Sequence, residues 1–222
     1  MTQTHDKKIA LVTGASRGLG AAMAETLSGT GWHVVALGRT MGALEELDDR
    51  IKSKGGTATL AAMDIAQDDA IRHLCRDIHD RWGHLDLWVH TAIHAPPMSP
   101  ADHVTLKDWD KCMAINIRAT GVMIPMIAPL LTAAPQRARA LFIDDAAARA
   151  KFMGAYGASK AAQIALARAW QLETTRVGPR ILIEQANPMP TATRARFYPG
   201  ENRNTLTPCR QEAERLLQAV TS

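Results

Sequence analysis

The stretch "KIALVTGASRGLG", residues 8–20, places an apolar run directly before a glycine-rich turn. The run is typical of a buried strand, and Gly14, Gly18 and Gly20 follow it in a G-x-x-x-G-x-G pattern that opens a helix. Glycine permits a tight turn and a close approach to the backbone, so N–H groups at the start of the helix can contact a pyrophosphate. A lone glycine pattern can also be a plain strand-to-helix turn. Here strand, glycines and helix occur in order within one βαβ unit, which favours dinucleotide binding.

The same alternation of apolar runs and helical patterns continues along the chain. The runs lie at 8–15, 33–39, 58–65, 85–92, 139–145 and 180–188. The helical patterns follow at 18–30, 41–53, 67–82, 104–131, 154–177 and 208–220. Strands buried on both faces read as continuous apolar runs, and parallel neighbours need helical crossovers. We therefore predict an α/β fold over residues 1–222, a single Rossmann-type domain with a doubly wound parallel sheet of about six strands.

One segment lacks this organisation. Residues 189–207, "MPTATRARFYPGENRNTLT", are rich in Pro, Gly, Asn and Thr, and they predict a long flexible loop. In doubly wound sheets, a loop at the carboxyl edge of a strand is where ligands bind. We therefore expect this loop to shape a substrate pocket.

Composition and spacing argue against several other classes of protein. The net charge of +4 arises from Lys and Arg spread along the chain without a basic run, so we expect no nucleic-acid partner. The N-terminus lacks an apolar signal region, and the longest apolar stretch, "GVMIPMIAPLL", is too short to span a membrane. The three cysteines have no paired spacing, which favours a cytoplasmic protein, and the eight histidines show no zinc-binding pattern, so we expect no metal.

Two arginines predict which dinucleotide the turn binds. The second apolar run ends in "ALGRT", which places Arg39 where many dinucleotide folds have an acid that holds the ribose 2′-hydroxyl. Arg39 and Arg17 together suit a 2′-phosphate, because guanidinium groups form charge-assisted hydrogen bonds with a dianion. This pattern favours NADP(H) over NAD(H). The alternative is a surface Arg39 that pairs with Glu45 or Asp48 on the next helix.

A tyrosine and a lysine lie four residues apart in "YGASK", residues 156–160. At this spacing they share one helix face, so the Lys160 ammonium can approach the Tyr156 phenol and lower its pKa from about 10. Such a tyrosine can act as a general acid or base. An isolated pair could equally be a surface Tyr beside a Lys, but the dinucleotide turn upstream favours an active site.

Five motifs in this order resemble those of the classical short-chain dehydrogenase/reductase (SDR) family over nearly the whole chain. "TGASRGLG" is similar to the family's cofactor signature, and "MDI" to its adenine-contacting turn. "AINIRAT" resembles the segment that carries the active-site Asn, and "YGASK" resembles the Y-x-x-x-K motif. "NPMPTAT" is similar to a degraded form of the segment after the sixth strand.

The resemblance implies roles for particular residues. Lys160 would also hold the nicotinamide ribose, and Asn116 would support a proton relay through water, although Asn116 could instead be a satisfied polar residue in a helix. Thr191 and Thr193 are candidates for the carboxamide and the phosphates. With the two arginines, the residues expected to bind the cofactor are Gly14, Ser16, Arg17, Gly18, Leu19, Gly20, Arg39, Asp64, Ile65, Ala92, Tyr156, Lys160, Pro188, Thr191 and Thr193.

One member of the family's catalytic set is missing. The family has a Ser on the loop after the fifth strand, but counting back from Tyr156 reaches "IDD", residues 143–145, and no Ser or Thr occurs within 142–155. We predict that Asp144 takes this place as the fourth catalytic residue, beside Tyr156, Lys160 and Asn116; the alternative is that a water replaces the missing hydroxyl. An ionised carboxylate only accepts hydrogen bonds, so Asp144 would imitate a hydroxyl donor only when protonated.

Two further departures leave the function open. Ile93 and Met189 stand where the family has glycines, and they add bulk beside the expected nicotinamide. The first hypothesis is an NADP(H)-dependent oxidoreductase that moves a hydride between nicotinamide and a small-molecule carbonyl or alcohol, with Tyr156 as acid or base. The alternative is a catalytically degenerate relative that binds a dinucleotide as a sensor or partner subunit.

The family usually has a seventh strand, and we expect none in this sequence, which ends at Ser222. That strand often forms one interface of a tetramer. Its absence favours a homodimer built on the helices predicted at 104–131 and 154–177.

Overall fold

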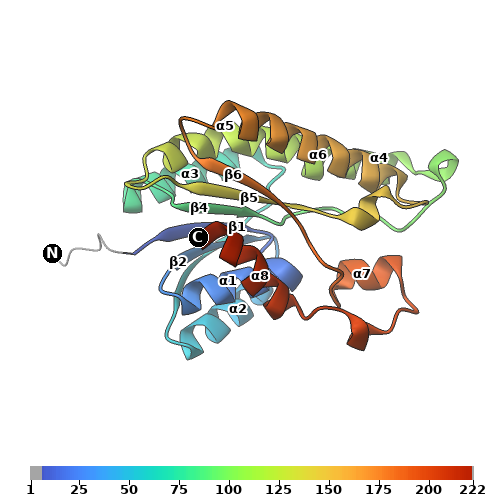
Figure 1. Cartoon of the computed structure of the whole chain (residues 1–222), viewed down its shortest axis with the longest axis horizontal. Coiled ribbons are helices and arrows are strands. Elements are labelled where there is room, and N and C mark those ends of the chain that lie inside the picture. Colours follow the sequence, from blue (N-terminus) through green and yellow to red (C-terminus); the bar gives the residue numbers. More distant parts are fainter. Residues whose placement is uncertain (1–6, 222) are drawn as a thin grey trace.

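Six parallel strands form one sheet in the computed structural model, which describes residues 7–221 (Figure 1). Their order in space is β3-β2-β1-β4-β5-β6, and every neighbouring pair is parallel. The strands are β1 (Ile9–Thr13), β2 (His33–Gly38), β3 (Thr57–Ala62), β4 (Leu87–His90), β5 (Arg139–Asp144) and β6 (Arg180–Gln185). This topology confirms the predicted doubly wound α/β fold.

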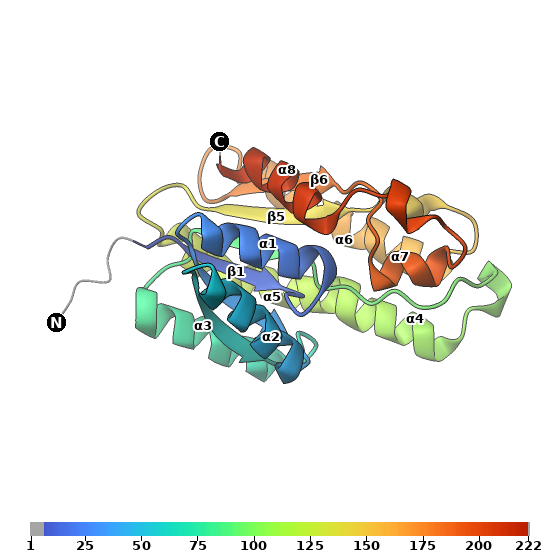
Figure 2. The same ribbon diagram turned by 90° about the horizontal axis from the view of Figure 1, so that it is seen from below.

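Helices cover both faces of the sheet. On one face lie α1 (Gly18–Gly29), α2 (Met41–Ser53) and α8 (Cys209–Thr221), with α1 in contact with both of the others (Figure 1, Figure 2). On the other face lie α3 (Asp68–Trp82), α4 (Leu106–Cys112), α5 (Ala119–Thr132) and α6 (Gly154–Glu173). The remaining elements are short: α7 (Ala192–Phe197) and the turns η1 (Ala101–His103), η2 (Met113–Arg118), η3 (Ala146–Arg149) and η4 (Arg203–Thr205).

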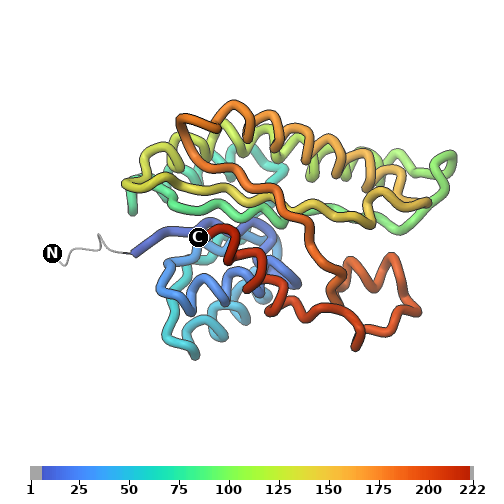
Figure 3. Tube along the Cα trace, viewed as in Figure 1, coloured from blue at the N-terminus to red at the C-terminus, as the bar shows by residue number. Residues whose placement is uncertain are grey.

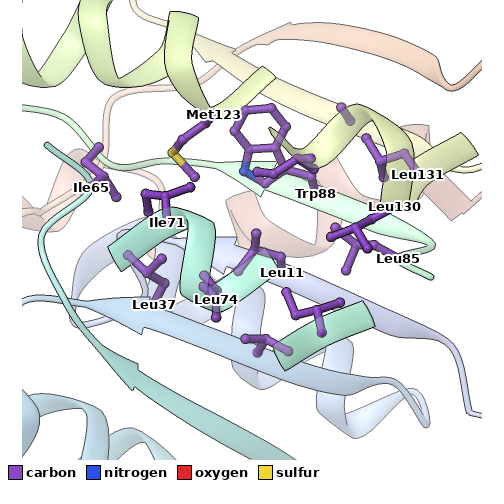
Figure 4. Close-up of a cluster of buried hydrophobic side chains, with 14 of the residues drawn as sticks. Leu11, Leu37, Ile65, Ile71, Leu74, Leu85, Trp88, Met123, Leu130 and Leu131 are labelled. Carbon is purple, nitrogen blue, oxygen red and sulfur yellow. The ribbon is translucent and has the colours of Figure 1, made fainter. Parts of the chain in front are cut away.

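Each face of the sheet packs into its own core. Along β1, Ile9 and Leu11 point into one core, and Ala10 and Val12 point into the other, as the two-residue period of a strand requires. Figure 4 shows the first core, where Trp88 from β4 lies among side chains from the sheet and from the helices above it. Burial on both faces explains why the strands read as continuous apolar runs.

The helix predicted at 104–131 is interrupted. It begins as α4, passes through the π turn η2 and continues as α5. By length and composition alone, Leu106–Thr132 could cross a membrane. In this fold it packs along the sheet, and Met123, Ile127 and Leu131 are buried in the first core.

The segment predicted as a loop, residues 189–207, contains α7 and η4. The hydroxyl of Thr191 accepts a hydrogen bond from the backbone N of Arg194 (3.1 Å) and caps α7. Arg194 then pairs with Glu201 at 2.6 Å. Figure 3 shows the trace leaving β6, turning through α7 and returning to α8, so this segment stands beyond the carboxyl ends of the strands.

The strand order determines where a ligand can bind. From β1 the chain winds outward to β2 and β3, and from β4 it winds the opposite way to β5 and β6. The crossovers on the two sides of this switch therefore diverge and leave a crevice at the carboxyl ends of β1 and β4.

Candidate active site

A cavity of about 1310 Å³ opens at this edge of the sheet. It is larger than the roughly 300–1,000 Å³ typical of small-molecule sites, as a site for a dinucleotide and a substrate together requires. Every residue that the sequence predicts to bind the cofactor lines this one cavity, and so does Asp144. Asn116 is the exception, because it is fully buried behind the cavity wall.

The glycine turn brings backbone against backbone. Gly14 has a φ of +82°, and a side chain there would place its Cβ 2.8 Å from the Cα of Ala92. A Cβ at Gly20 would collide with the carbonyl oxygen of Gly14 and the hydroxyl of Thr91. No side chain caps α1 at Arg17, so the first N–H groups of the helix remain available to an anion. This cradle fits the pyrophosphate of a dinucleotide.

Arg17 and Arg39 are exposed side chains on the wall of the same cavity. Within residues 7–221 neither guanidinium forms an ion pair, and Asp48 is instead bound to Lys52 Nζ at 2.6 Å. The alternative pairing of Arg39 with Glu45 or Asp48 is therefore not formed. Two unpaired guanidinium groups fit a phosphate dianion.

Hydrogen bonds fix the turns that carry the other predicted cofactor residues. After β3, Oδ1 of Asp64 accepts a hydrogen bond from the backbone N of Ala66 at 3.0 Å. After β6, the backbone N and side-chain Nδ2 of Asn187 donate to the buried Glu212 carboxylate in α8, at 2.8 and 2.9 Å. The last helix of the chain thus holds the turn that precedes Pro188.

Tyr156 and Lys160 lie one turn apart on α6, and only 2% and 4% of their surfaces are exposed. Tyr156 Oη donates a hydrogen bond to Oδ2 of Asp145 at 2.9 Å. Lys160 Nζ donates to the carbonyl oxygen of Ile143 and, at 2.7 Å, to Oε1 of Gln163. The predicted pair therefore meets two groups that the sequence analysis did not assign, Asp145 and Gln163.

The carboxylate beside Tyr156 belongs to Asp145, so the prediction that Asp144 takes the place of the missing hydroxyl is wrong. Asp144 ends β5, and successive side chains along a strand point to opposite sides. Asp144 Oδ2 binds Arg149 at 2.7 Å, whereas Asp145 Oδ1 caps the backbone N of Ala147 at 2.9 Å. Burial raises the pKa of Asp144, but the hydrogen bonds from Arg149 and from the Asp145 backbone N, together with the positive charges of Arg149 and Lys160, outweigh burial, so the pKa lies below its ordinary value and the carboxyl is ionised.

The pKa of the phenol moves opposite to the sequence prediction. Burial raises the pKa of Tyr156 above its ordinary value, and Asp145 raises it further because a phenolate would face another anion. Burial lowers the pKa of Lys160 to about 8, although the charges of Asp144 and Asp145 oppose this shift. At neutral pH the site therefore holds a protonated phenol beside an ammonium group.

Asn116 joins elements behind the site. Its Oδ1 accepts a hydrogen bond from the backbone N of His94 (2.7 Å), and its Nδ2 donates to the His94 carbonyl (2.9 Å) and to Ser159 Oγ (2.8 Å). Its own carbonyl oxygen accepts from Thr120 Oγ1 (2.9 Å) and Gln163 Nε2 (3.0 Å). The side chain is thus a satisfied polar residue within a helix, the alternative that the sequence left open.

Ile93 and Met189, which replace glycines of the family pattern, both line the cavity. The two side chains do not fill the cavity, because a volume of about 1310 Å³ remains with both in place. Their bulk therefore leaves room for a ligand.

The comparisons with known proteins agree with this fold. Residues 8–203 match the family model for short chain dehydrogenase. A solved short chain dehydrogenase from Pseudomonas syringae is 30% identical, with a TM-score of 0.87 over 95% of this chain and 87% of the other. One from Shigella flexneri, complexed with NADP, is 25% identical, with a TM-score of 0.82 over 94% and 89% of the two chains. A sorbitol dehydrogenase from Cereibacter sphaeroides is 29% identical over 175 residues, 78% of this chain and 67% of the relative.

Proposed function

Because the chain belongs to the short-chain dehydrogenase family, we propose that it is an NADP(H)-dependent oxidoreductase acting on a small-molecule carbonyl or alcohol. The observation that carries the proposal is that one cavity contains both the glycine cradle and the Tyr156–Lys160 pair. The bound nicotinamide would supply or accept the hydride. The glycine turn would hold the pyrophosphate, Asp64 and Ile65 the adenine side, Thr191 and Thr193 the nicotinamide side, and Lys160 the ribose.

The preference for NADP(H) over NAD(H) is part of this proposal. It is supported by the two unpaired guanidinium groups, Arg17 and Arg39, on the cavity wall. A 2′-phosphate would give them the anionic partner that residues 7–221 do not supply. The Shigella relative was solved with NADP.

In the proposed reaction, Tyr156 is the proton donor during carbonyl reduction. Its raised pKa keeps the phenol protonated at neutral pH, and its proton points at Asp145 until a carbonyl oxygen of the substrate replaces that acceptor. Lys160 contributes a nearby positive charge that stabilises the phenolate left after proton transfer. The arrangement favours reduction over alcohol oxidation, which would need an ionised tyrosine at the start.

The alternative is a degenerate member that binds a dinucleotide without useful turnover, and Asp145 supports it. A carboxylate beside the reacting oxygen accepts hydrogen bonds only, so it cannot stabilise a developing alkoxide. The loss of one preorganised donor costs roughly 3 kcal/mol of barrier, or about a hundredfold in rate. Dinucleotide binding is common to both functions, so only turnover separates them.

The test is NADPH oxidation by purified protein with a panel of aldehydes and ketones. Under the proposal, wild type turns over at least one substrate, and Tyr156→Phe lowers kcat by a factor on the order of 10²–10⁴ without preventing NADPH binding. The matched control is Tyr198→Phe, which removes the other tyrosine hydroxyl of the chain and keeps the ring packed on Arg194. Full activity in Tyr156→Phe would refute the mechanism, and binding without turnover across the panel would favour the alternative.

We also propose a cytoplasmic homodimer. The support for dimerisation is a set of exposed apolar side chains on and beside the long helices: Leu106 and Trp109 on α4, Leu172 on α6, and Val177. The support for a reducing compartment is that Cys75, Cys112 and Cys209 are all free. Sedimentation equilibrium of wild type and of Leu172→Glu tests the dimer, because a charge in that interface would shift the mass toward the monomer.

A further inference from the structure

Gln163 is a polar residue in a place where helices usually pack with apolar ones. It lies on α6, one turn after Lys160, and only 1% of its surface is exposed. Both ends of its amide are used: Oε1 accepts from Lys160 Nζ at 2.7 Å, and Nε2 donates to the Asn116 carbonyl oxygen and to Thr120 Oγ1, each at 3.0 Å. A buried amide with all of these partners has one fixed orientation, because a flip would place its NH₂ against the ammonium and its oxygen against a carbonyl oxygen.

The acceptor that Gln163 finds on the neighbouring helix, the Asn116 carbonyl oxygen, depends on the π turn. Asn116 lies within η2, where the backbone leaves the α-helical hydrogen-bond register. Its carbonyl oxygen takes up two side-chain donors, the Thr120 hydroxyl and the Gln163 amide. The π turn therefore gives Gln163 a backbone acceptor on the neighbouring helix.

The Lys160 ammonium has three N–H donors, and two of them are directed away from substrate. One donates to the Ile143 carbonyl at the end of β5, and one to Gln163 Oε1. The third is left for the cavity, which Lys160 lines together with Tyr156. Loss of either fixed acceptor would let the ammonium turn and would remove a group that stabilises its charged form.

We propose that Gln163 is a positioning residue for Lys160: its amide is anchored on the Asn116 carbonyl, holds the ammonium through Oε1, and thereby directs the remaining N–H into the cavity. We call this arrangement of Gln163, Lys160 and the Asn116 carbonyl the Gln163 clamp, and it rests only on the contacts above. Its consequence for catalysis rests on the proposed function.

Charged groups around Lys160 also affect its pKa, so they have to be considered before a titration of Lys160 can be used as a test. The carboxylates of Asp144 and Asp145 face it from the end of β5 and η3, and they favour the ammonium. His90 on β4 is fully buried, and burial lowers its pKa to about 3, so it is neutral at working pH. Because the Gln163 variants keep all of these neighbours, a difference in the Lys160 titration midpoint between variants reports on Gln163.

The experiment follows the Lys160 side chain directly, without any substrate. Protein labelled with ¹³C at the lysine ε-carbons is titrated by NMR, and the Lys160 signal is assigned by its absence in Lys160→Arg. Removal of one hydrogen bond to a charged group in Gln163→Leu is expected to lower the titration midpoint by about one pH unit. Gln163→Glu retains an acceptor and adds a negative charge, so its midpoint is expected to rise.

The matched control is Gln171→Leu. Gln171 lies two turns further along α6, and its Nε2 donates to the Ile181 carbonyl at 2.7 Å, so this change also removes an amide hydrogen bond, here a partly buried one. Its Lys160 midpoint is expected to equal that of wild type. An unchanged midpoint in folded Gln163→Leu would overturn the proposal, and if that variant does not fold, an unchanged midpoint in Gln163→Glu would do so.

Activity gives a second readout that can fail separately. With a substrate in hand, Gln163→Leu should lower kcat about tenfold while the basic limb of the kcat/KM profile moves with the NMR midpoint, and Gln163→Glu should restore much of kcat. A wild type without turnover would refute the proposed function and leave the titration result standing. If Gln163→Leu shifts the NMR midpoint of Lys160 but leaves the kcat/KM pH profile unchanged, Gln163 positions Lys160 without an effect on catalysis, and that part of the proposal is refuted.

Discussion

Asp145 determines the charge that surrounds the reacting proton. Its Oδ2 lies 2.9 Å from Tyr156 Oη, and its other oxygen is fixed by a backbone N–H in η3, so the carboxylate cannot easily turn away. A hydroxyl at this place would donate to a substrate oxygen, whereas the carboxylate can only accept. Under the proposed function, this single residue would therefore set the rate of carbonyl reduction.

Replacement of this carboxylate by a hydroxyl should accelerate the reaction. We expect Asp145→Ser to raise kcat by about tenfold to a hundredfold, because it restores a donor and removes the anion that opposes a phenolate. Steady-state NADPH oxidation measures the effect. Asp144→Ser is the matched control, since its carboxylate pairs with Arg149 and accepts from the Asp145 backbone N but forms no hydrogen bond with Tyr156, so the change should alter kcat little. A fall in kcat for Asp145→Ser would mean that Asp145 itself takes part in proton transfer.

His90 should make the protein sensitive to acid. It is 3% exposed and bridges Thr13 Oγ1 (2.8 Å) and Thr120 Oγ1 (3.0 Å) as a neutral ring. Burial lowers its pKa from 6.5 to about 3, so between these values only the unfolded chain takes up the proton, and stability is lost as pH falls below 6.5. By linkage, His90 accounts for about 2 kcal/mol of the loss between pH 7 and pH 5.

Urea unfolding at pH 7 and pH 5 checks this prediction. In His90→Gln the loss of unfolding free energy between the two pH values should be smaller than in wild type by about that amount. The control is His103→Gln, which changes an exposed histidine and should leave the pH dependence as it is. Equal losses in wild type and His90→Gln would show that another group carries the acid sensitivity.

Residues fixed by local spacing could be predicted, and residues fixed by a loop could not. Tyr156 and Lys160 share a face because α6 is a regular helix there. The three glycines all lie at the turn that begins α1. A count along the chain does not distinguish Asp145 from Asp144, because it does not reveal in which direction each side chain leaves the end of a strand. Gln163 carried a weak signal, a polar residue one turn after Lys160, but its partners come from another helix.

At the scale of the element, the glycine turn should tolerate no side chain at its tightest point. Gly20→Ala would drive a methyl group into the Gly14 carbonyl and the Thr91 hydroxyl, so we expect NADPH affinity to fall at least tenfold and stability to fall by about 1–3 kcal/mol. Gly29→Ala is the matched control at the other end of α1, where a Cβ meets nothing within 4 Å. NADPH fluorescence titration and urea unfolding measure both variants; unchanged affinity in Gly20→Ala would exclude this turn as the pyrophosphate site.

Elements with a strong period were predictable, and elements set by tertiary contacts were not. The alternation of apolar runs and amphipathic helices located all six described strands. The six residues of α7 have no usable period, and the helix depends on the Thr191 cap and the Arg194–Glu201 pair. The π turn η2 is likewise invisible in sequence, because its extra residue is accommodated by contacts with α6.

At the scale of the whole molecule, cofactor binding should stabilise the fold. A ligand that binds only the native state at a hundred times its Kd adds about 2.7 kcal/mol to the unfolding free energy. We expect NADPH to raise Tm more than NADH at equal concentration, and the double change Arg17→Ala and Arg39→Ala to remove this difference. Differential scanning fluorimetry checks it, with NADH as the internal control. Equal shifts for both dinucleotides in wild type would refute the preference for NADP(H).

The π turn also has a consequence for chain length. An α-helix advances about 100° per residue, and a π turn contains one residue more than the α-helix needs. Deletion of a single residue such as Ala114 would let Leu106–Thr132 continue as one regular α-helix. It would rotate α4 relative to α5 by about 100° and withdraw the Asn116 carbonyl from Gln163. A one-residue deletion within η2 would thus remove a support of Lys160 without replacing any residue that lines the cavity.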